Sequence, residues 1–187
     1  MPHSCWISQA EEKIRYLQHN NKRSNKGYVE HLLKVVTSVE QYVSPKGTGL
    51  DFGSGPSPVL GEILREAGFS CVDYDPIFYP SREFSALRNF FDFVVTCEAA
   101  EHFKDPLLEW KEMVKVLKPG GVVIVSTKTV KDQCSEEEFL RWWYIRDATH
   151  ISFYSKKSVE LLARQLGVRV KQFSEDGFVV IKNEITT

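Results

Sequence analysis

Apolar residues recur along the chain at two spacings, and the two spacings alternate. Between residues 28 and 43 they fall every third or fourth position, at Tyr28, Leu32, Val35 and Val39, which predicts a helix with one buried face. Short apolar runs then alternate with further helical patterns. We expect strands at residues 49–52, 69–74, 91–95, 122–126, 168–173 and 178–182, and helices at 57–67, 105–117 and 155–166. This alternation favours a parallel sheet with helices on both faces.

Cap and turn residues support these boundaries. Ser57 is expected as an N-cap, with Pro58 at the first helical position, and Asp105 stands in the same place before another helix. Gly68 and Gly167 follow helical patterns, where a left-handed residue is common. Only four residues, 174–177, separate the last two strands, so they are expected to form a hairpin, with the final strand antiparallel to its neighbour.

Composition excludes several classes of protein. The 187 residues carry 24 Lys and Arg against 25 Asp and Glu, a net charge of −1, which argues against nucleic-acid binding as the main activity. The longest apolar runs have only a few residues, so no membrane segment is expected, and the first residues do not resemble a signal peptide. The four cysteines lack metal-site spacing and indicate a reduced, cytoplasmic protein.

The chain is expected to have two parts. Residues 1–47 are interpreted as an N-terminal helical arm or lid, with a short helix at 11–17 and a polar loop at 19–27. Residues 48–187 form the α/β domain.

Candidate chemistry lies directly after the first two strands, where open α/β sheets bind ligands. Asp51, Gly53 and Gly55 end the first strand, and the glycines allow a tight turn and close ligand approach. Asp75 follows the second strand, 75 − 55 = 20 residues after Gly55, the usual interval to a ribose-binding carboxylate. The alternative is a glycine-rich turn with no ligand.

The turn fits S-adenosylmethionine better than a dinucleotide. Pro58 occupies the place of the third glycine that a pyrophosphate site needs. The Asp51 carboxylate would repel a pyrophosphate but could hold a cationic ammonium or sulfonium ligand, directly or through water. Alternatively, Asp51 caps backbone N–H groups of the loop.

Residues 48–184 resemble the class I S-adenosylmethionine-dependent methyltransferases. Four segments carry the resemblance: 50–55 (LDFGSG), 74–76 (YDP), 91–102 (FDFVVTCEAAEH) and 117–121 (LKPGG). The resemblance implies a Rossmann-like three-layer sandwich with a mostly parallel sheet and an antiparallel last strand. It also implies S-adenosyl-L-methionine as cofactor, bound by Asp51, Gly53, Ser54, Gly55, Asp75, Pro76, Cys97 and Glu98.

The chain departs from this family in one region. Only about 15 residues separate the second strand from residue 91, too few for a full strand and helix. The family's third strand and its helix are therefore expected to be trimmed. The acid that contacts adenine in that family then has no match here.

A narrower resemblance, to a group of small methyltransferases, covers residues 139–154. The shared residues are Phe139, Trp142, Tyr144, Asp147, Thr149, His150, Phe153 and Tyr154, together with His19 and Asn20 upstream. This group has no settled acceptor.

His150 is the candidate general base, because its unperturbed pKa of about 6.5 suits proton removal; the alternative is a histidine that only bonds a loop. Trp142, Tyr144 and Asp147 are expected to wall the acceptor pocket, or else to pack the loop on the domain edge, and Trp143 is expected to face away. His19 and Asn20 could close the site as a lid, or lie in a solvated loop.

Other ionisable residues have structural interpretations. Glu101 and His102 could cap or precede the helix that starts at Asp105, and His102 could bond a neighbouring strand end. A metal site built from His19, His102, His150 and Glu98 is set aside, because the four come from separate segments without ligand spacing. No metal is expected.

The predicted function is methyl transfer from S-adenosylmethionine to an unidentified, small-molecule acceptor. One alternative is a non-catalytic module that binds the cofactor or a partner protein. Another is an NAD(P)-dependent oxidoreductase, which Asp51 and Pro58 disfavour. The open sheet edge would favour a homodimer.

Overall fold

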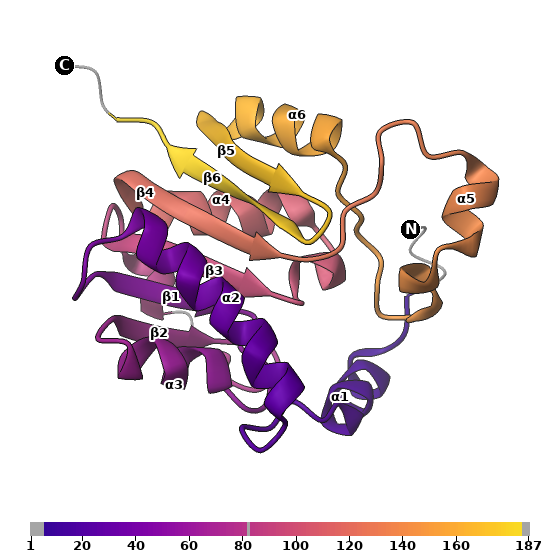
Figure 1. Cartoon of the computed structure of the whole chain (residues 1–187), viewed down its shortest axis with the longest axis horizontal. Helices are drawn as coiled ribbons and strands as arrows, with labels where there is room; N and C mark the ends of the chain where they lie inside the picture. Colours follow the sequence, from indigo (N-terminus) through magenta and orange to yellow (C-terminus); the bar gives the residue numbers. More distant parts are fainter. Residues whose placement is uncertain (1–5, 82, 185–187) are drawn as a thin grey trace.

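A computed structural model of the chain describes residues 6–81 and 83–184. Cys5 and the first residues of the predicted arm lie outside the described residues. Within the described ranges, six strands form one sheet in the order β2-β1-β3-β4-β6-β5 (Figure 1). The strands are β1 Thr48–Phe52, β2 Ser70–Tyr74, β3 Phe91–Cys97, β4 Leu117–Ser126, β5 Val168–Ser174 and β6 Gly177–Lys182. The helices are α1 Gln9–Gln18, α2 Lys26–Tyr42, α3 Val59–Glu66, α4 Pro106–Val116, α5 Glu136–Arg141 and α6 Lys156–Leu166.

Strand directions confirm the predicted fold class. β2, β1, β3 and β4 pair in parallel, whereas β6 is antiparallel to both β4 and β5. β6 thus inserts between β4 and β5 as the hairpin partner that the short connection at 174–177 predicts. The sheet is Rossmann-like and mixed, as expected.

The connection between β2 and β3 is short, and β2 is an edge strand of the sheet. In the described part of this connection the chain forms a 3-10 turn, Glu83–Ala86, and a bridge between Asp75 and Tyr79. No strand forms beyond β2 among the described residues, which agrees with the predicted trimming.

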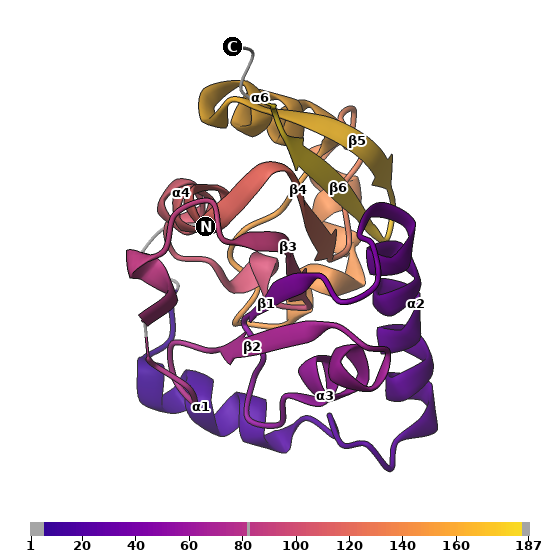
Figure 2. The same cartoon turned by 90° about the vertical axis from the view of Figure 1, so that its left-hand side faces the viewer.

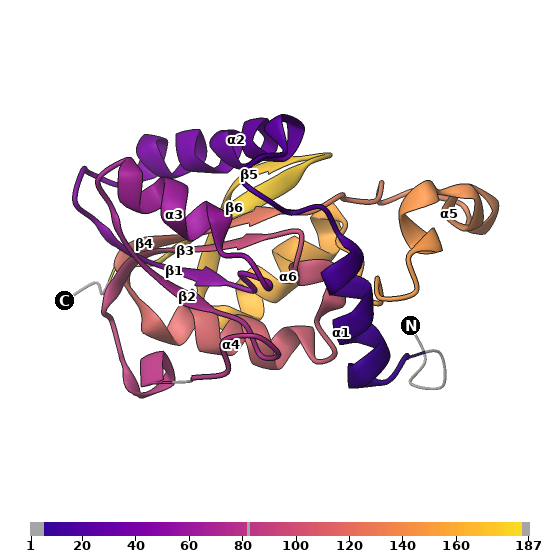
Figure 3. The same ribbon diagram turned by 90° about the horizontal axis from the view of Figure 1, so that it is seen from below.

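Helices cover both faces of the sheet. α2 and α3 lie on one face and α4 and α6 on the other (Figure 3). Side chains alternate between the two layers along the central strands: Val94 packs with Trp110 and Met113 of α4, whereas Phe93 and Val95 pack with the α2 and α3 layer. These strands are buried on both faces because both faces carry helices.

One predicted cap is wrong. Pro58, not Ser57, precedes α3, and no side chain caps that helix. Pro58 has ψ 55°, outside the helical range, and the Val59 N–H donates to the Ser57 carbonyl, so the helix begins later than expected. The Asp105 cap forms as predicted, accepting from Leu108 N at 3.0 Å.

α1 lies outside the sandwich, at the end of the molecule where the parallel strands end, and α5 projects from the same end (Figures 1 and 3). In the side view α1 runs along the lower edge, below β2 (Figure 2). α2 instead packs on the sheet through Leu32, Val35 and Val39. The boundary at residues 47 and 48 stays a prediction. No helix in the described ranges combines the length and apolarity needed to cross a bilayer.

Candidate active site

The turn after β1 is built by two glycines in left-handed conformations. Gly53 has φ +94°, and a Cβ there would lie 2.5 Å from the Ala99 Cβ. Gly55 has φ +67° and open space above it. The N–H groups of Gly53 and Ser54 both donate to the Tyr74 carbonyl, at 2.8 and 3.0 Å. The turn is therefore tied to the end of β2, and only glycine fits its two special positions without strain.

Asp75 holds the same turn from the other side. Its Oδ2 accepts from the Gly55 N–H at 3.0 Å, and its Oδ1 accepts from Ile77 and Phe78 N–H at 2.8 and 3.0 Å. The side chain thus has a structural role that the sequence did not predict. A carboxylate oxygen can accept two hydrogen bonds, so Oδ2 keeps a lone pair for a ligand hydroxyl.

Asp51 is buried at the end of β1 and lines the same cleft. Burial, followed by the nearby charges of Asp73 and Asp75, raises its pKa from 3.8 to about 8. Arg65 opposes the rise but does not cancel it. The carboxyl group therefore carries a proton at neutral pH, and a cation brought beside it would release that proton.

Ser54 supplies a polar atom that lacks a partner. Its Oγ is buried and has no hydrogen-bond partner among the described residues. A buried hydroxyl without a partner is uncommon, and a bound polar ligand would satisfy it. With Asp51 and the Asp75 lone pair, this fits a ligand that has both cationic and hydroxyl groups, as S-adenosylmethionine does.

A buried hydrogen-bonded network surrounds Glu101 beyond the end of β3. The Tyr144 hydroxyl donates to Glu101 Oε1 at 2.5 Å, and the Thr127 hydroxyl donates to Oε2 at 2.8 Å. Glu101 is fully buried, and this burial together with the charge of Glu98 raises its pKa to about 7. Glu101 precedes α4, one of the two predicted options, and does not cap it, since Asp105 is the cap.

Two histidines lie beside this network. His102 Nδ1 lies 2.9 Å from the Thr149 carbonyl oxygen, and His150 Nδ1 lies 2.7 Å from the Tyr144 carbonyl oxygen. Because a carbonyl only accepts, both Nδ1 atoms carry the proton, and Nε2 is the lone-pair nitrogen of each neutral ring. The ring centroids are 4.9 Å apart. Burial lowers the pKa of both histidines below its ordinary value, which favours the neutral rings.

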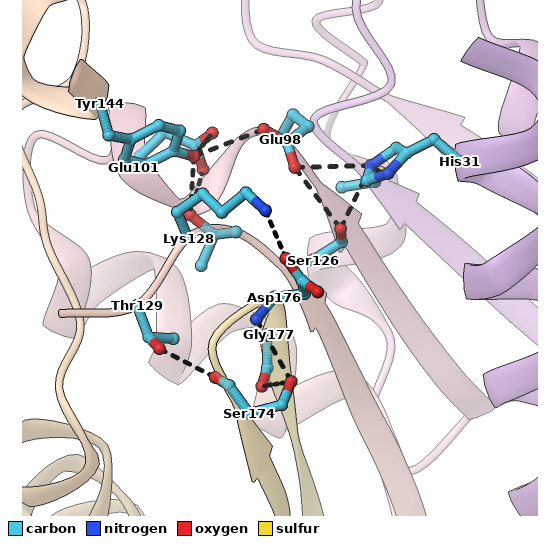
Figure 4. Close-up of polar contacts among 12 residues, drawn as sticks. His31, Glu98, Glu101, Ser126, Lys128, Thr129, Tyr144, Ser174, Asp176 and Gly177 are labelled. Carbon is cyan, nitrogen blue, oxygen red and sulfur yellow. Dashed lines mark hydrogen bonds and ion pairs between the residues drawn. The ribbon is translucent and has the colours of Figure 1, made fainter. Parts of the chain in front are cut away.

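Glu98 lies between the glycine turn and the Glu101 network. It adopts φ +48°, and its N–H donates to the Ser126 carbonyl at 2.8 Å. Its side chain lies 3.5 Å from His31 Nε2 and 3.4 Å from the Tyr144 hydroxyl (Figure 4). Lys128 pairs with Asp176 on the β5–β6 turn nearby (Figure 4). The left-handed backbone at Glu98 aims its carboxylate into the cleft.

One cleft of about 930 Å³ joins these groups. Ligand pockets usually measure roughly 300–1,000 Å³, so a cofactor and a second small molecule can share it. All predicted site residues line it except Asn20 and Trp142; those that do are Asp51, Gly53, Ser54, Gly55, Asp75, Pro76, Cys97, Glu98, His19, Tyr144, Asp147 and His150.

The side chains of Asn20 and Trp142 do not line this cleft. Asn20 accepts a hydrogen bond from Asn25 through its carbonyl, at 3.0 Å. Trp142 packs against Phe139 and Phe153 and faces a second, smaller pocket. Trp143, expected to face away, lines the main cleft instead. The segment is a 3-10 turn, whose side-chain directions cannot be read from simple alternation.

α1 covers the histidine side of the cleft. The Tyr16 ring packs edge-on to His102 with centroids 5.2 Å apart, and the Tyr16 hydroxyl donates to Glu12 at 2.8 Å. Arg15 pairs with Asp147 at 2.8 Å and helps to hold the Asp147 pKa well below its usual range, with hydrogen bonds from Thr149. These contacts place the arm where a lid would lie.

Sequence reasoning missed several lining residues. Tyr28 and His31 come from α2, and Tyr16 and Glu12 come from α1. Tyr28 and His31 are three residues apart, on adjacent helical turns beside the buried Leu32, so helical periodicity could have placed them on one face. The site was predicted from residues that follow strand ends, and this approach does not identify residues on helices that precede the first strand.

Comparisons with known proteins agree with this geometry. No curated protein matches the chain. Among solved structures, the YcgJ protein of Bacillus subtilis aligns with a TM-score of 0.57 and 15% identity, covering 78% of this chain and 71% of that one. An O-methyltransferase family protein from Burkholderia thailandensis aligns with a TM-score of 0.63 and 13% identity, covering 94% and 64%. At these identities the likeness shows the fold.

A sequence family adds the decisive match. The family described as a methyltransferase domain matches residues 17–172, which is most of the chain and includes both the glycine turn and the Glu101 network. The match begins within α1 and ends in β5. The chain therefore belongs to this methyltransferase-domain family.

Proposed function

We propose that the protein transfers a methyl group from S-adenosylmethionine to a small-molecule acceptor. The observation that carries this proposal is that the buried Asp51 carboxyl and a buried Ser54 hydroxyl, without a partner among the described residues, both line the cleft at a left-handed glycine turn. When bound, the cofactor supplies a methyl group already activated on a sulfonium. Asp51, Gly53, Ser54, Gly55, Asp75, Pro76, Cys97 and Glu98 are the residues proposed to hold it.

The same turn disfavours a dinucleotide. A pyrophosphate site needs free backbone N–H groups at the glycine turn. Here the N–H groups of Gly53, Ser54 and Gly55 all donate to protein acceptors. Pro58, at the start of α3, has no N–H to offer.

The acceptor is proposed to bind beside Tyr144 and His150, which line the same cleft, and Tyr144 contacts the Glu98 carboxylate on the cofactor side. The main work of the protein in such a reaction is alignment, worth roughly 7–11 kcal/mol when near ideal. The proposal that His150 is a general base rests on Nε2, the one ring atom that can accept a proton while Nδ1 is bonded to Tyr144.

Calorimetric titration with S-adenosylhomocysteine and with NAD⁺, in parallel, tests the cofactor. We expect S-adenosylhomocysteine to bind and NAD⁺ not to bind. Binding of NAD⁺ alone would overturn the proposal in favour of an oxidoreductase.

A non-catalytic binding module is the second candidate, favoured by the shortened sheet that ends at β2. Incubation with cofactor labelled in its methyl group and a metabolite extract separates the two. An enzyme transfers label to a product, whereas a sensor retains all label in the cofactor.

The free thiols of Cys71, Cys97 and Cys134 fit the proposed cytoplasmic location, because reducing compartments keep thiols unpaired. The edge strand β2, with Val72 49% exposed, is where a proposed homodimer would form.

A further inference from the structure

Three side chains with metal-ligating atoms meet in the wall of the main cleft. One such atom from each of Glu101, His102 and His150 lies within 4.8 Å of the other two. All three residues line the main cleft. Metal–ligand bonds of about 2.0–2.2 Å place the donor atoms of one site roughly 3–3.5 Å apart, so a shift of about 1 Å would close this set around an ion.

Both histidine rings are held in the tautomer that a metal requires. His102 Nδ1 donates to the Thr149 carbonyl and His150 Nδ1 donates to the Tyr144 carbonyl. Each ring therefore presents Nε2 with its lone pair. Ligating histidines characteristically donate the other ring N–H to a carbonyl or carboxylate in this way.

The carboxylate is held in the same manner. The hydroxyls of Tyr144 and Thr127 donate to different oxygens of Glu101, and each oxygen keeps a lone pair. Among the described residues no ion pair neutralises Glu101. This buried carboxylate lies close to two imidazole rings and has no cationic partner, and a bound cation would supply the missing positive charge.

We propose that Glu101, His102 and His150 bind a divalent transition-metal ion through a carboxylate oxygen and two Nε2 atoms. Two imidazoles and one carboxylate suit Mn²⁺, Fe²⁺, Co²⁺ or Zn²⁺ better than Mg²⁺ or Ca²⁺, which prefer oxygen ligands throughout. Three protein ligands leave at least one coordination position open, and that position faces the cleft.

The open position gives the metal a role that rests on the proposed function. An ion there would hold an oxygen of the methyl acceptor, which narrows the acceptor to compounds with a hydroxyl or carboxylate group. His150 Nε2 cannot hold a metal and accept a proton at once, so in the metal-bound protein His150 is a ligand and not the general base.

Titration of untagged, chelator-treated protein with Co²⁺, followed by visible absorption, tests the site. We expect one Co²⁺ per chain with micromolar or tighter affinity. Glu101→Gln, His102→Ala and His150→Ala should each weaken Co²⁺ binding at least tenfold, and Glu40→Gln, on exposed α2 surface, should leave it unchanged. Wild-type protein that takes up no Co²⁺ below 1 mM, or ligand variants that bind as wild type does, would overturn the proposal.

Thermal melts of each variant in the presence of chelator serve as the control for correct folding. Should a ligand variant melt well below wild type, Thr127→Val replaces it, because it removes a hydrogen bond to the ligating carboxylate and the contact with the Tyr144 hydroxyl, but no ligand atom. Loss of such a supporting bond should weaken Co²⁺ binding about 10–100-fold. Unchanged affinity in Thr127→Val would contradict the proposal.

Two further measurements test the open coordination position and distinguish the metal site from the proposed function. With Mn²⁺ in place of Co²⁺, enhanced water-proton relaxation is expected if the open position carries exchangeable water; no enhancement would contradict an open face. S-adenosylhomocysteine is titrated into metal-free and Co²⁺-loaded protein. Co²⁺ binding without S-adenosylhomocysteine binding would refute the proposed function alone, and the reverse result would refute the metal site alone.

Discussion

Asp51 is the residue whose charge reports most directly on the proposed cofactor site. Its pKa is raised to about 8 in the folded protein, from an ordinary value of 3.8. Between these two values the folded chain holds a proton that the unfolded chain has lost. Stability should therefore fall as pH rises from about 4 to 8, and Asp51→Asn should lessen this fall.

The affinity for a cationic ligand should rise with pH, whereas the stability of the protein falls. A cationic ligand prefers the ionised carboxylate, so below pH 8 the ligand must displace the Asp51 proton. We expect the affinity for S-adenosylmethionine to rise with pH, by up to about tenfold per pH unit, between pH 6 and 8. Calorimetry across this range checks it. The same pH dependence in Asp51→Asn would show that Asp51 does not contact the cation.

Asp75 tests the ribose contact. Asp75→Ala should weaken S-adenosylhomocysteine binding by about 1–3 kcal/mol, because it removes an acceptor that both shapes the turn and keeps a lone pair for a hydroxyl. Asp92→Ala is the matched control: Asp92 bonds Thr48 and Lys118, away from the cleft. Equal affinities in wild type and Asp75→Ala, measured by calorimetry, would end the ribose assignment.

At the scale of elements, α1 and α2 behave differently although both precede the first strand. α1 contacts the site through side-chain pairs such as Arg15–Asp147, whereas α2 is part of the core. The sequence indicated this amphipathic α2 correctly from the spacing of Leu32, Val35 and Val39. It could not indicate where α1 lies, because the contacts of α1 are with residues distant in the chain.

If α1 is a lid, ligand binding should slow amide hydrogen exchange across Gln9–Gln18, since Tyr16 and Glu12 line the cleft. Arg15→Ala should speed exchange there by up to about fivefold, the range for a surface ion pair. Arg141→Ala, which breaks a similar exposed pair with Glu137 inside α5, should not. If the rate of amide hydrogen exchange in α1 changes neither on ligand binding nor in Arg15→Ala, α1 is not a lid.

The packing of α2 gives a stability prediction. Leu32 is 1% exposed and its neighbour Leu33 is 46% exposed. Leu32→Ala should lower the free energy of unfolding by about 2–5 kcal/mol, while Leu33→Ala should change it by no more than about 0.5 kcal/mol. Urea denaturation measures both. Similar values for the two variants would mean that α2 is a detachable arm.

For the whole molecule, the sequence predicted the sheet, its mixed direction and the loss of the third strand. It did so because strand and helix periods are local and the connection after β2 is visibly short. The residues proposed to bind the cofactor could also be found from the sequence, since Gly53, Gly55 and Asp75 follow strand ends directly and line the cleft. The predicted direction of Trp143 was wrong, because Trp143 lies in a 3-10 turn, whereas the packing of Trp142 agrees with the alternative of a loop packed on the domain edge. The meeting of Glu101 and His102 with His150 depends on a long loop folding back, which no local spacing encodes.

The proposed methyltransferase function depends on one contact: the Gly53–Ser57 turn and Asp75 jointly bind the cofactor. A crystal structure grown with S-adenosylhomocysteine tests it most directly. We predict density for the ligand between the turn and Asp75, with its amino group near Asp51 and its sulfur directed toward Glu98. A cleft closed by the protein's own side chains, or ligand bound elsewhere, would contradict it.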